Sequence, residues 1–111
     1  PAVGTDAPVC DVDPFPNLAA MLTRRTGRGT LLGGQERLEI DEALSAYTLN
    51  GAFLEHVEDR KGRLVPGQLA DVAVFATDLR TMSPEALAAD AVCDLTILGG
   101  RPVLDRQGEA A

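Results

Sequence analysis

The sequence predicts an α+β fold in which two helices come first and a small sheet follows. Apolar residues recur at helical spacing over 15–26 and 40–54, whereas 70–76 and 93–105 combine short apolar runs with turn residues. The 111 residues predict one domain, and the 45% hydrophobic content is typical of a globular protein. Because aromatic residues make up only 4%, the core must consist of Ala, Val, Leu and Ile.

Two amphipathic helices are predicted in the first half of the chain. The first covers 15–26, where the apolar side chains share one face and two arginines near the end suit the negative pole of the helix dipole. The second covers 40–54 and has two acidic residues in its first turn, where the dipole favours them. A glycine-rich connection joins the two helices.

Turn chemistry predicts a small sheet in the second half. The stretch 65–68, Val-Pro-Gly-Gln, has the residues of a type II turn, and 70–76 after it is predicted to be a buried strand. Ser83 and Pro84 begin a short helix that runs to about Ala89. The remaining stretch, 93–105, predicts a hairpin with a Gly-Gly turn, and its proline confines the last strand to the sheet edge.

The net charge and the two cysteines indicate which partners and which cellular compartment to expect. The net charge of −7 argues against a nucleic-acid partner or an anionic membrane surface, and no apolar run approaches the length of a membrane span. Cys10 and Cys93 stand far apart and form no CxxC pattern, which predicts reduced thiols and a cytoplasmic protein; a single bridge between them is the alternative. Cys93 is predicted to be in the core and Cys10 to be more exposed, and neither is expected to be a nucleophile.

The first candidate site residue is Asp6. It stands in the stretch Gly-Thr-Asp-Ala-Pro-Val at 4–9, a loop that usually follows a buried strand, although only three residues precede it here. Taken alone, Asp6 is best explained as an Asx-type turn residue whose carboxylate bonds nearby backbone N–H groups.

The other polar candidates predict structural roles. His56 is the only histidine and cannot build a zinc site alone, so a surface position near a helix C-terminus is expected. Asp11 and Asp13 lack the glycine and the terminal glutamate of a calcium loop, and Asp13 is expected to cap the first helix. Asp71 is predicted to bond the turn backbone beside Gly67.

Five stretches, taken in order, resemble the C-terminal end of the amidohydrolase superfamily. They are GTDAPV, DPFPNLAAMLTRRT, ERLEIDEALSAYTLNGAF, KGRLVPGQLADVAVFATDL and LTILGGRPVLD. The branch called amidohydrolase family 3, which also resembles the D-aminoacylases, is the best match. The combination of EALSAYTLN with GRLVPGQLAD, in that order, carries the resemblance.

This resemblance implies a longer parent protein with a metal-dependent (β/α)8 barrel and a small composite β-sandwich. Residues 1–55 would then be a barrel-end segment, comprising the tail of strand eight, a loop and two helices. Residues 56–111 would be the C-terminal β-sandwich segment. The strand missing before Asp6 would lie upstream, in the rest of the barrel.

The resemblance also implies an activity, the hydrolysis of non-peptide carbon–nitrogen bonds in small-molecule amides or cyclic amides. Asp6 would hold the catalytic divalent metal, expected to be zinc, and accept a proton from the attacking water. The barrel histidines and the carboxylated lysine would lie upstream, so the chain alone is expected to be inactive and without a cofactor. Thr5 and Ala7 stand where the family commonly has Ser and Trp, so its substrate class is not carried over.

Two other classes of function stay open at this point. The chain could be a stand-alone structural or oligomerisation module, or a small-ligand binding module. An H-x-H pattern on an apolar strand upstream would favour the hydrolase, and a ligand-dependent melting shift would favour the binding module. Because helices 15–26 and 40–54 would normally cover a barrel, the chain alone is expected to expose apolar surface and to self-associate.

Overall fold

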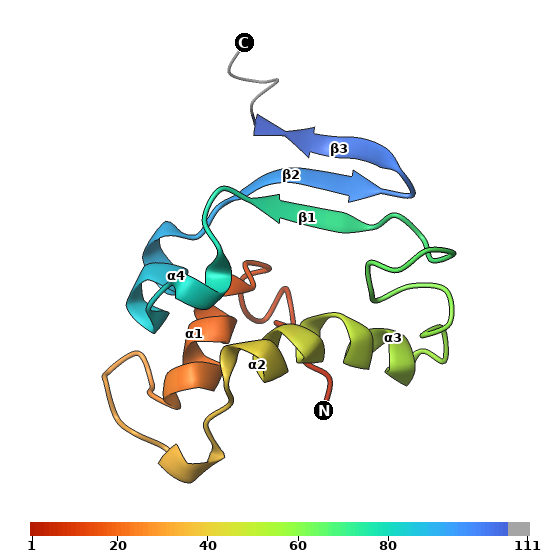
Figure 1. Cartoon of the computed structure of the whole chain (residues 1–111). Coiled ribbons are helices and arrows are strands. Elements are labelled where there is room, and N and C mark those ends of the chain that lie inside the picture. Colours follow the sequence, from red (N-terminus) through yellow and green to blue (C-terminus); the bar gives the residue numbers. More distant parts are fainter. Residues whose placement is uncertain (107–111) are drawn as a thin grey trace.

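A helical layer and a three-stranded antiparallel sheet make up the computed structural model, which describes residues 1–106 (Figure 1). The last five positions of the expected sandwich segment, 107–111, lie outside the described residues. The elements are, in order, α1 (Phe15–Thr23), α2 (Ile40–Tyr47), α3 (Leu49–Leu54), β1 (Val72–Phe75), α4 (Pro84–Asp90), β2 (Cys93–Leu98) and β3 (Arg101–Asp105). This arrangement confirms the predicted mixture of helices and a small sheet, in the predicted order.

Helix α1 begins as the sequence predicts but ends earlier. The N-cap residue is Pro14 and not Asp13 as expected, although the Asp13 carboxylate accepts a hydrogen bond from the N–H of Phe15, the first helical residue, at 3.0 Å. The helix ends at Thr23 and not at residue 26, because Arg24 adopts a left-handed conformation with φ 56°. The Arg24 N–H still donates to the Ala20 carbonyl, at 2.7 Å.

The predicted helix 40–54 is two helices, α2 and α3. A capping box begins α2, since the Glu42 carboxylate accepts from the N–H of Glu39 at 3.1 Å. Thr48, with φ −117° and ψ −90°, separates the two helices. Its hydroxyl donates to the Leu44 carbonyl at 2.8 Å, and its N–H donates to the Ser45 carbonyl at 3.2 Å. This local competition for the last carbonyls of α2 is a known effect of threonine, and apolar periodicity does not reveal it.

The sheet has the order β1-β2-β3, and both pairings are antiparallel. Gly99 and Gly100, with φ 57° and 83°, form the predicted hairpin turn, and β3 lies at an edge, as its proline requires. The prediction of a buried strand at 70–76 is wrong in part: β1 spans only Val72–Phe75, and Val74 is 41% exposed. Within residues 1–106 the sheet has helices on one side only, so β1 is not enclosed (Figure 1).

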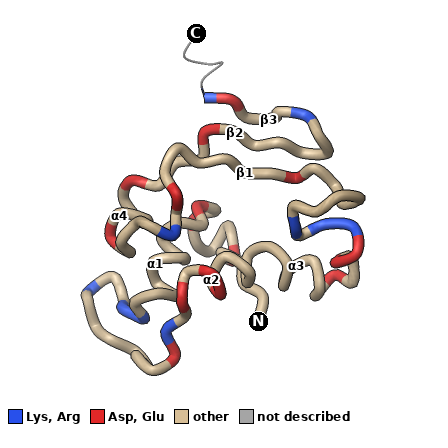
Figure 2. Tube along the Cα trace, viewed as in Figure 1, with Lys and Arg blue, Asp and Glu red and all other residues tan. Residues whose placement is uncertain are grey.

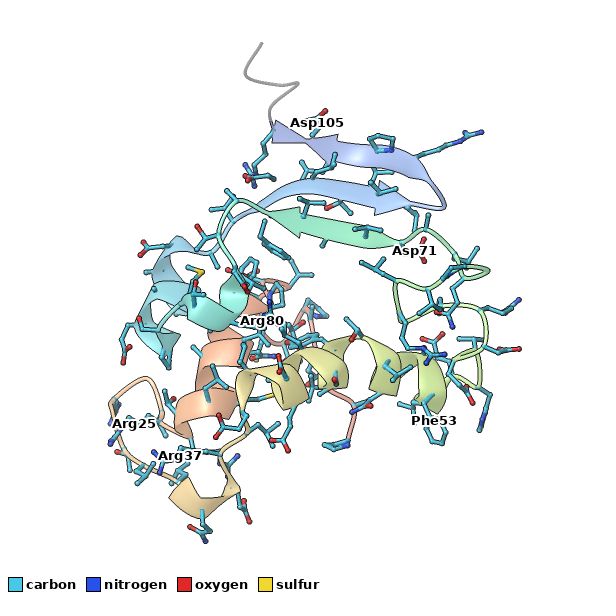
Figure 3. The ribbon with its side chains drawn as sticks, viewed as in Figure 1. Arg25, Arg37, Phe53, Asp71, Arg80 and Asp105 are labelled. Atoms are coloured by element: carbon cyan, nitrogen blue, oxygen red, sulfur yellow. The ribbon has the colours of Figure 1, made fainter. Side chains whose placement is uncertain are left out.

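The prediction that Asp71 bonds the turn backbone beside Gly67 is wrong. Its carboxylate accepts a hydrogen bond from the N–H of Gly99 at 2.8 Å, and the next N–H, that of Gly100, donates to the Ala70 carbonyl at 2.9 Å. Asp71 therefore fixes the β2–β3 turn against the start of β1 (Figure 3). The turn at 65–68 forms as predicted without it, closed by the N–H of Gln68 and the carbonyl of Val65 at 3.2 Å.

The buried core is small and lies mainly among the helices. Among residues 1–106, six apolar residues are buried: Leu18, Ala43, Ala46, Ala52, Leu79 and Leu87. Five of them belong to the helices, which pack as α1 against α4 and α2 and as α2 against α3, and Leu79 lies in the connection between β1 and α4. Many large apolar side chains remain exposed, among them Phe53 at 64% and Leu54 at 71%, which agrees with the predicted apolar surface.

Both cysteines are free; Cys10 is exposed as expected, whereas Cys93 is half-buried and not in the core as predicted, because β2 belongs to a sheet with helices on one side only in the described part of the chain (Figure 1). Basic residues concentrate in the connection 24–37 and in the loop 60–63, while acidic residues are spread over helices and sheet (Figure 2).

None of the described helices has both the length and the apolar character that a membrane crossing requires.

Candidate functional site

The segment that leads to Asp6 lies against the helices and forms no regular strand. The N–H of Val3 donates to the carbonyl of Ala46 at 3.2 Å. Ala46 is in the last turn of α2, where carbonyls lack partners within the helix because α2 ends at Tyr47. The break after α2 therefore leaves a backbone acceptor that the segment before Asp6 uses.

Asp6 itself is held in an unusual backbone conformation, with its side chain in solvent. Its φ is 58°, in the left-handed region that aspartate tolerates better than most residues. The N–H groups of Val9 and Cys10 donate to its carbonyl oxygen, at 2.9 and 3.4 Å, and the peptide between Ala7 and Pro8 is cis. The backbone carbonyl, and not the carboxylate, thus closes this turn.

The Asp6 carboxylate is available to an external partner. Asp6 is exposed, and no hydrogen bond or ion pair engages its side chain within residues 1–106. The expected Asx-type bonding is therefore not what the structure has. No group of three or more His, Cys, Asp or Glu side chains within this range is arranged to hold a metal ion. A metal at Asp6 would need its other ligands from elsewhere.

Two residues that the sequence did not single out, Asn17 and Tyr47, lie beside this loop. The Asn17 amide nitrogen, Nδ2, donates to the carbonyl of Gly4 at 3.3 Å and to the Tyr47 hydroxyl at 3.0 Å. A third contact, from Asn50 Nδ2 to the carbonyl of Pro1 at 2.6 Å, holds the start of the same segment. The EALSAYTLN stretch already contained Tyr47 and Asn50, but no local pattern links either of them to residues 1–6.

Two other residues considered in the sequence, His56 and Asp11, form no hydrogen bond with Asp6. His56 is exposed and directly follows the end of α3, as predicted, in a left-handed conformation with φ 61°. Asp11 accepts a hydrogen bond from the N–H of Asp13 at 3.3 Å. Asp78 pairs with Arg80 at 3.0 Å, and the hydrogen bonds from Arg80 lower the pKa of the Asp78 carboxyl and raise that of the guanidinium.

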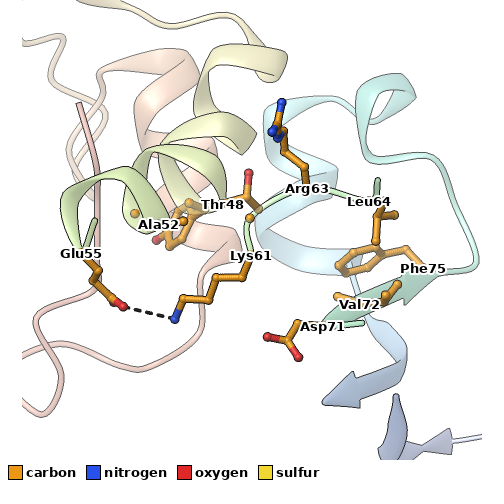
Figure 4. Close-up of a pocket in the computed structure, with 13 residues that line it drawn as sticks. Thr48, Ala52, Glu55, Lys61, Arg63, Leu64, Asp71, Val72 and Phe75 are labelled. Carbon is orange, nitrogen blue, oxygen red and sulfur yellow. Dashed lines mark ion pairs between the residues drawn. The ribbon is translucent and has the colours of Figure 1, made fainter. Parts of the chain in front are cut away.

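A groove of about 570 Å³ separates α2 and α3 from β1 (Figure 4). Its walls combine the apolar side chains of Ala52, Val72 and Phe75 with an ion pair between Lys61 and Glu55 at 3.2 Å. Tyr47 also lines this groove, whereas Asp6 does not. The hydroxyl of this tyrosine reaches the Asn17 amide, so the residue borders both the groove and the Asp6 segment.

Comparison with known families identifies the chain. The model described as "Amidohydrolase family" matches residues 1–104. The chain belongs to the amidohydrolase family. This finding confirms the resemblance seen in the sequence, and Asp6 lies within the matched region.

Individual relatives of this amidohydrolase chain match it over limited parts of their own length. An imidazolonepropionase from Kosmotoga olearia is 38% identical over 47 residues, which are 42% of the chain and 12% of that protein. Protein LONG AFTER FAR-RED 3 from Arabidopsis thaliana is 30% identical over 78 residues, 69% of the chain and 13% of that protein.

A solved structure shares the fold. The amidohydrolase from Thermotoga maritima MSB8 aligns with a TM-score of 0.68 and 24% identity, over 95% of this chain and 23% of its own. The chain thus spans less than a quarter of each of these relatives.

Proposed function

We propose that this chain is the C-terminal part of a metal-dependent amidohydrolase that cleaves non-peptide carbon–nitrogen bonds in small-molecule amides or cyclic amides. The observation that carries the proposal is the exposed Asp6 carboxylate, which has no partner within residues 1–106, in a chain of the amidohydrolase family. A carboxylate used only for folding would be expected to accept a hydrogen bond from the backbone, as Asp11 and Asp13 do within their own loop and Asp71 does from the β2–β3 turn.

The proposed architecture divides the chain between two parts of the parent protein. Residues 1–55 would end a (β/α)8 barrel, and residues 56–111 would contribute strands to a small composite β-sandwich. The likeness in fold to the Thermotoga maritima amidohydrolase supports a longer parent protein, since the match extends over 95% of this chain but only 23% of that one. The exposed β1 and the small core also agree with a chain that normally packs against further structure.

The proposed chemistry assigns two tasks to Asp6. A divalent metal, expected to be zinc, supplies Lewis acidity that lowers the pKa of water. The Asp6 carboxylate fits such a metal because it is anionic, exposed and free of internal hydrogen bonds, and oxygen ligands suit divalent cations. Asp6 would help to hold the metal and would take the proton of the attacking water on a carboxylate oxygen.

The test is the variant Asp6→Asn in the full-length protein that contains this chain. The amide keeps the shape of the side chain but loses its charge and most of its basicity, so turnover should fall by about 10²–10⁴-fold. The melting temperature should hardly change, because the turn depends on the backbone carbonyl of Asp6. Asp11→Asn is the matched control, since it makes the same change on the same loop and should leave turnover unaffected.

Metal content should be measured beside turnover for both variants and for the chain alone. The 111-residue chain should show no chelator-sensitive hydrolysis of amides or esters, because its described residues contain no complete set of ligands. Full turnover in Asp6→Asn would mean that Asp6 is only a turn residue. Activity lost together with folding would make its role structural.

A second candidate is an oligomerisation module without catalysis, favoured by the exposed Phe53 and Leu54 on the last turn of α3. The isolated chain should then self-associate at high concentration. Phe53→Ser with Leu54→Ser should reduce that association, as measured by sedimentation velocity. A clean monomer in the wild-type chain would contradict this candidate.

A further inference from the structure

We infer that Asn17 and Tyr47 are positioning residues that aim the Asp6 carboxylate, an inference that rests on the function proposed for Asp6. The contact that carries it is the amide of Asn17, which donates to the Gly4 carbonyl at 3.3 Å and to the Tyr47 hydroxyl at 3.0 Å. Gly4 stands two residues before Asp6, so this contact is made directly upstream of the proposed ligand.

Asp6 needs such support because its own loop does not fix its direction. The hydrogen bonds at 6–10 hold the turn together internally, but the carboxylate has no partner within residues 1–106. Gly4 gives the backbone before Asp6 conformational freedom, because glycine has no Cβ and no heavy atom lies within 4 Å of where a Cβ would be. The direction of the turn relative to the helices therefore depends on whatever holds the Gly4 backbone.

Asn17 is well placed to hold it. The residue is half-buried on α1, which packs against both α4 and α2. A primary amide carries two N–H groups, so Nδ2 can donate to Gly4 and Tyr47 at once. The tyrosine hydroxyl thereby fixes the rotation of the amide, and the helical contacts fix the position of α1.

Helix α2 then holds the segment before Asp6 at two successive residues. Ala46 accepts from the N–H of Val3 directly, at 3.2 Å, and the next residue, Tyr47, holds Gly4 through Asn17. Two helices from different parts of the chain thus define one backbone position. Because this position precedes Asp6 immediately, a shift here would move the carboxylate without unfolding the chain.

The primary test is Asn17→Leu in the full-length protein, with Gln68→Met as matched control. Leucine has nearly the shape of asparagine but cannot donate to the Gly4 carbonyl. Because a displacement of about 1 Å can cost about 10²-fold in rate, kcat should fall about 10–100-fold while KM stays within about twofold. Gln68→Met removes an amide that donates to the Glu58 carbonyl at 2.9 Å, in a loop remote from Asp6, and kcat should not change.

Two further readouts separate positioning from a merely structural role. The pH profile of kcat/KM should keep its wild-type apparent pKa values while falling in height, since the Asp6 carboxylate stays chemically the same. In an Asp6→Asn background, Asn17→Leu should cause no additional loss, because the carboxylate that it aims is gone. If Asn17→Leu does not fold, Tyr47→Phe decides the question, because it removes only the hydroxyl and should lower kcat about 3–10-fold with unchanged KM.

The possible outcomes are distinct. An unchanged kcat in Asn17→Leu would overturn the positioning role. If Asn17→Leu does not fold, an unchanged kcat in Tyr47→Phe would overturn it instead. The positioning role would also be overturned if adding Asn17→Leu to Asp6→Asn lowered kcat as much as it does in the wild type. If Asp6→Asn itself keeps full turnover, the proposed function fails and this inference fails with it. An inactive Asp6→Asn beside a fully active Asn17→Leu would remove the positioning role alone.

Discussion

Leu87 provides the most direct test of what holds the helical layer together. It lies on α4, it is 0% exposed, and α4 packs against α1, which carries Asn17. The change Leu87→Ala replaces a branched side chain with a methyl group. Alanine is a good helix former, so the substitution does not weaken helix α4 itself. Any loss of stability should therefore come from packing between α4 and its neighbours.

The expected loss follows from burial. Removing three buried carbon atoms at about 0.8 kcal/mol each costs about 2.4 kcal/mol in transfer free energy. A residual void of about 50 Å³ would add about 1 kcal/mol at about 24 cal/mol per Å³. The free energy of unfolding should thus fall by about 3–4 kcal/mol, a large share of the 5–15 kcal/mol (about 10 on average) that small proteins have.

Urea unfolding of the 111-residue chain, followed by circular dichroism, would measure this loss. With an m-value of about 1–3 kcal/mol per M, a loss of about 3 kcal/mol lowers the midpoint by about 1–3 M. Leu98→Ala is the matched control, since Leu98 is 61% exposed in β2, outside the helical layer, and its truncation should cost less than about 0.5 kcal/mol. Equal midpoints for the two variants, or a loss below about 1 kcal/mol for Leu87→Ala, would refute the assignment of the core to this packing.

Two smaller effects are also expected. His56→Gly should stabilise the chain by about 0.5–1 kcal/mol, because His56 has φ 61°, a conformation that glycine adopts freely; His56→Ala should give no such gain in urea unfolding. Asp78→Asn should lower the melting temperature slightly at pH 7, because hydrogen bonds from Arg80 hold the pKa of the Asp78 carboxyl below its ordinary value of 3.8. That contribution is complete above pH 3.8 and is lost as pH falls through the depressed pKa, so the two melting temperatures should converge in acid; a difference that persists there would contradict this cause.

The candidate site was predictable in part. The stretch around Asp6 and its resemblance to amidohydrolases identified the residue, and the family match extends over it. Sequence alone favoured a carboxylate that bonds its own turn, whereas the backbone carbonyl makes that bond. The difference is geometric: φ 58° at Asp6 brings the carbonyl, and not the side chain, toward the N–H of Val9.

The sequence by itself determined the local features of the fold, which depend on residues close together in the chain. The start of α1 after Asp13, the Ser83 cap of α4 and the Gly99-Gly100 hairpin each depend on groups within a few residues of one another. The residues that favour each contact stand close together in the chain, so composition and spacing predict them, although packing is still needed to stabilise such short elements. Even the break at Thr48 is local, but it depends on a side-chain bond that apolar periodicity does not register.

Tertiary structure decided the contacts between distant residues. Asn17 reaches Gly4 across 13 positions and Tyr47 across 30, and Asp71 reaches Gly99 across 28. Each of these polar side chains has several possible partners in an unfolded chain, and only the packing of α1 against α2, or of β1 beside the hairpin, selects one. The sequence therefore indicated the family and proposed Asp6 as a site residue, whereas the folded chain alone decided which residues hold the backbone before Asp6.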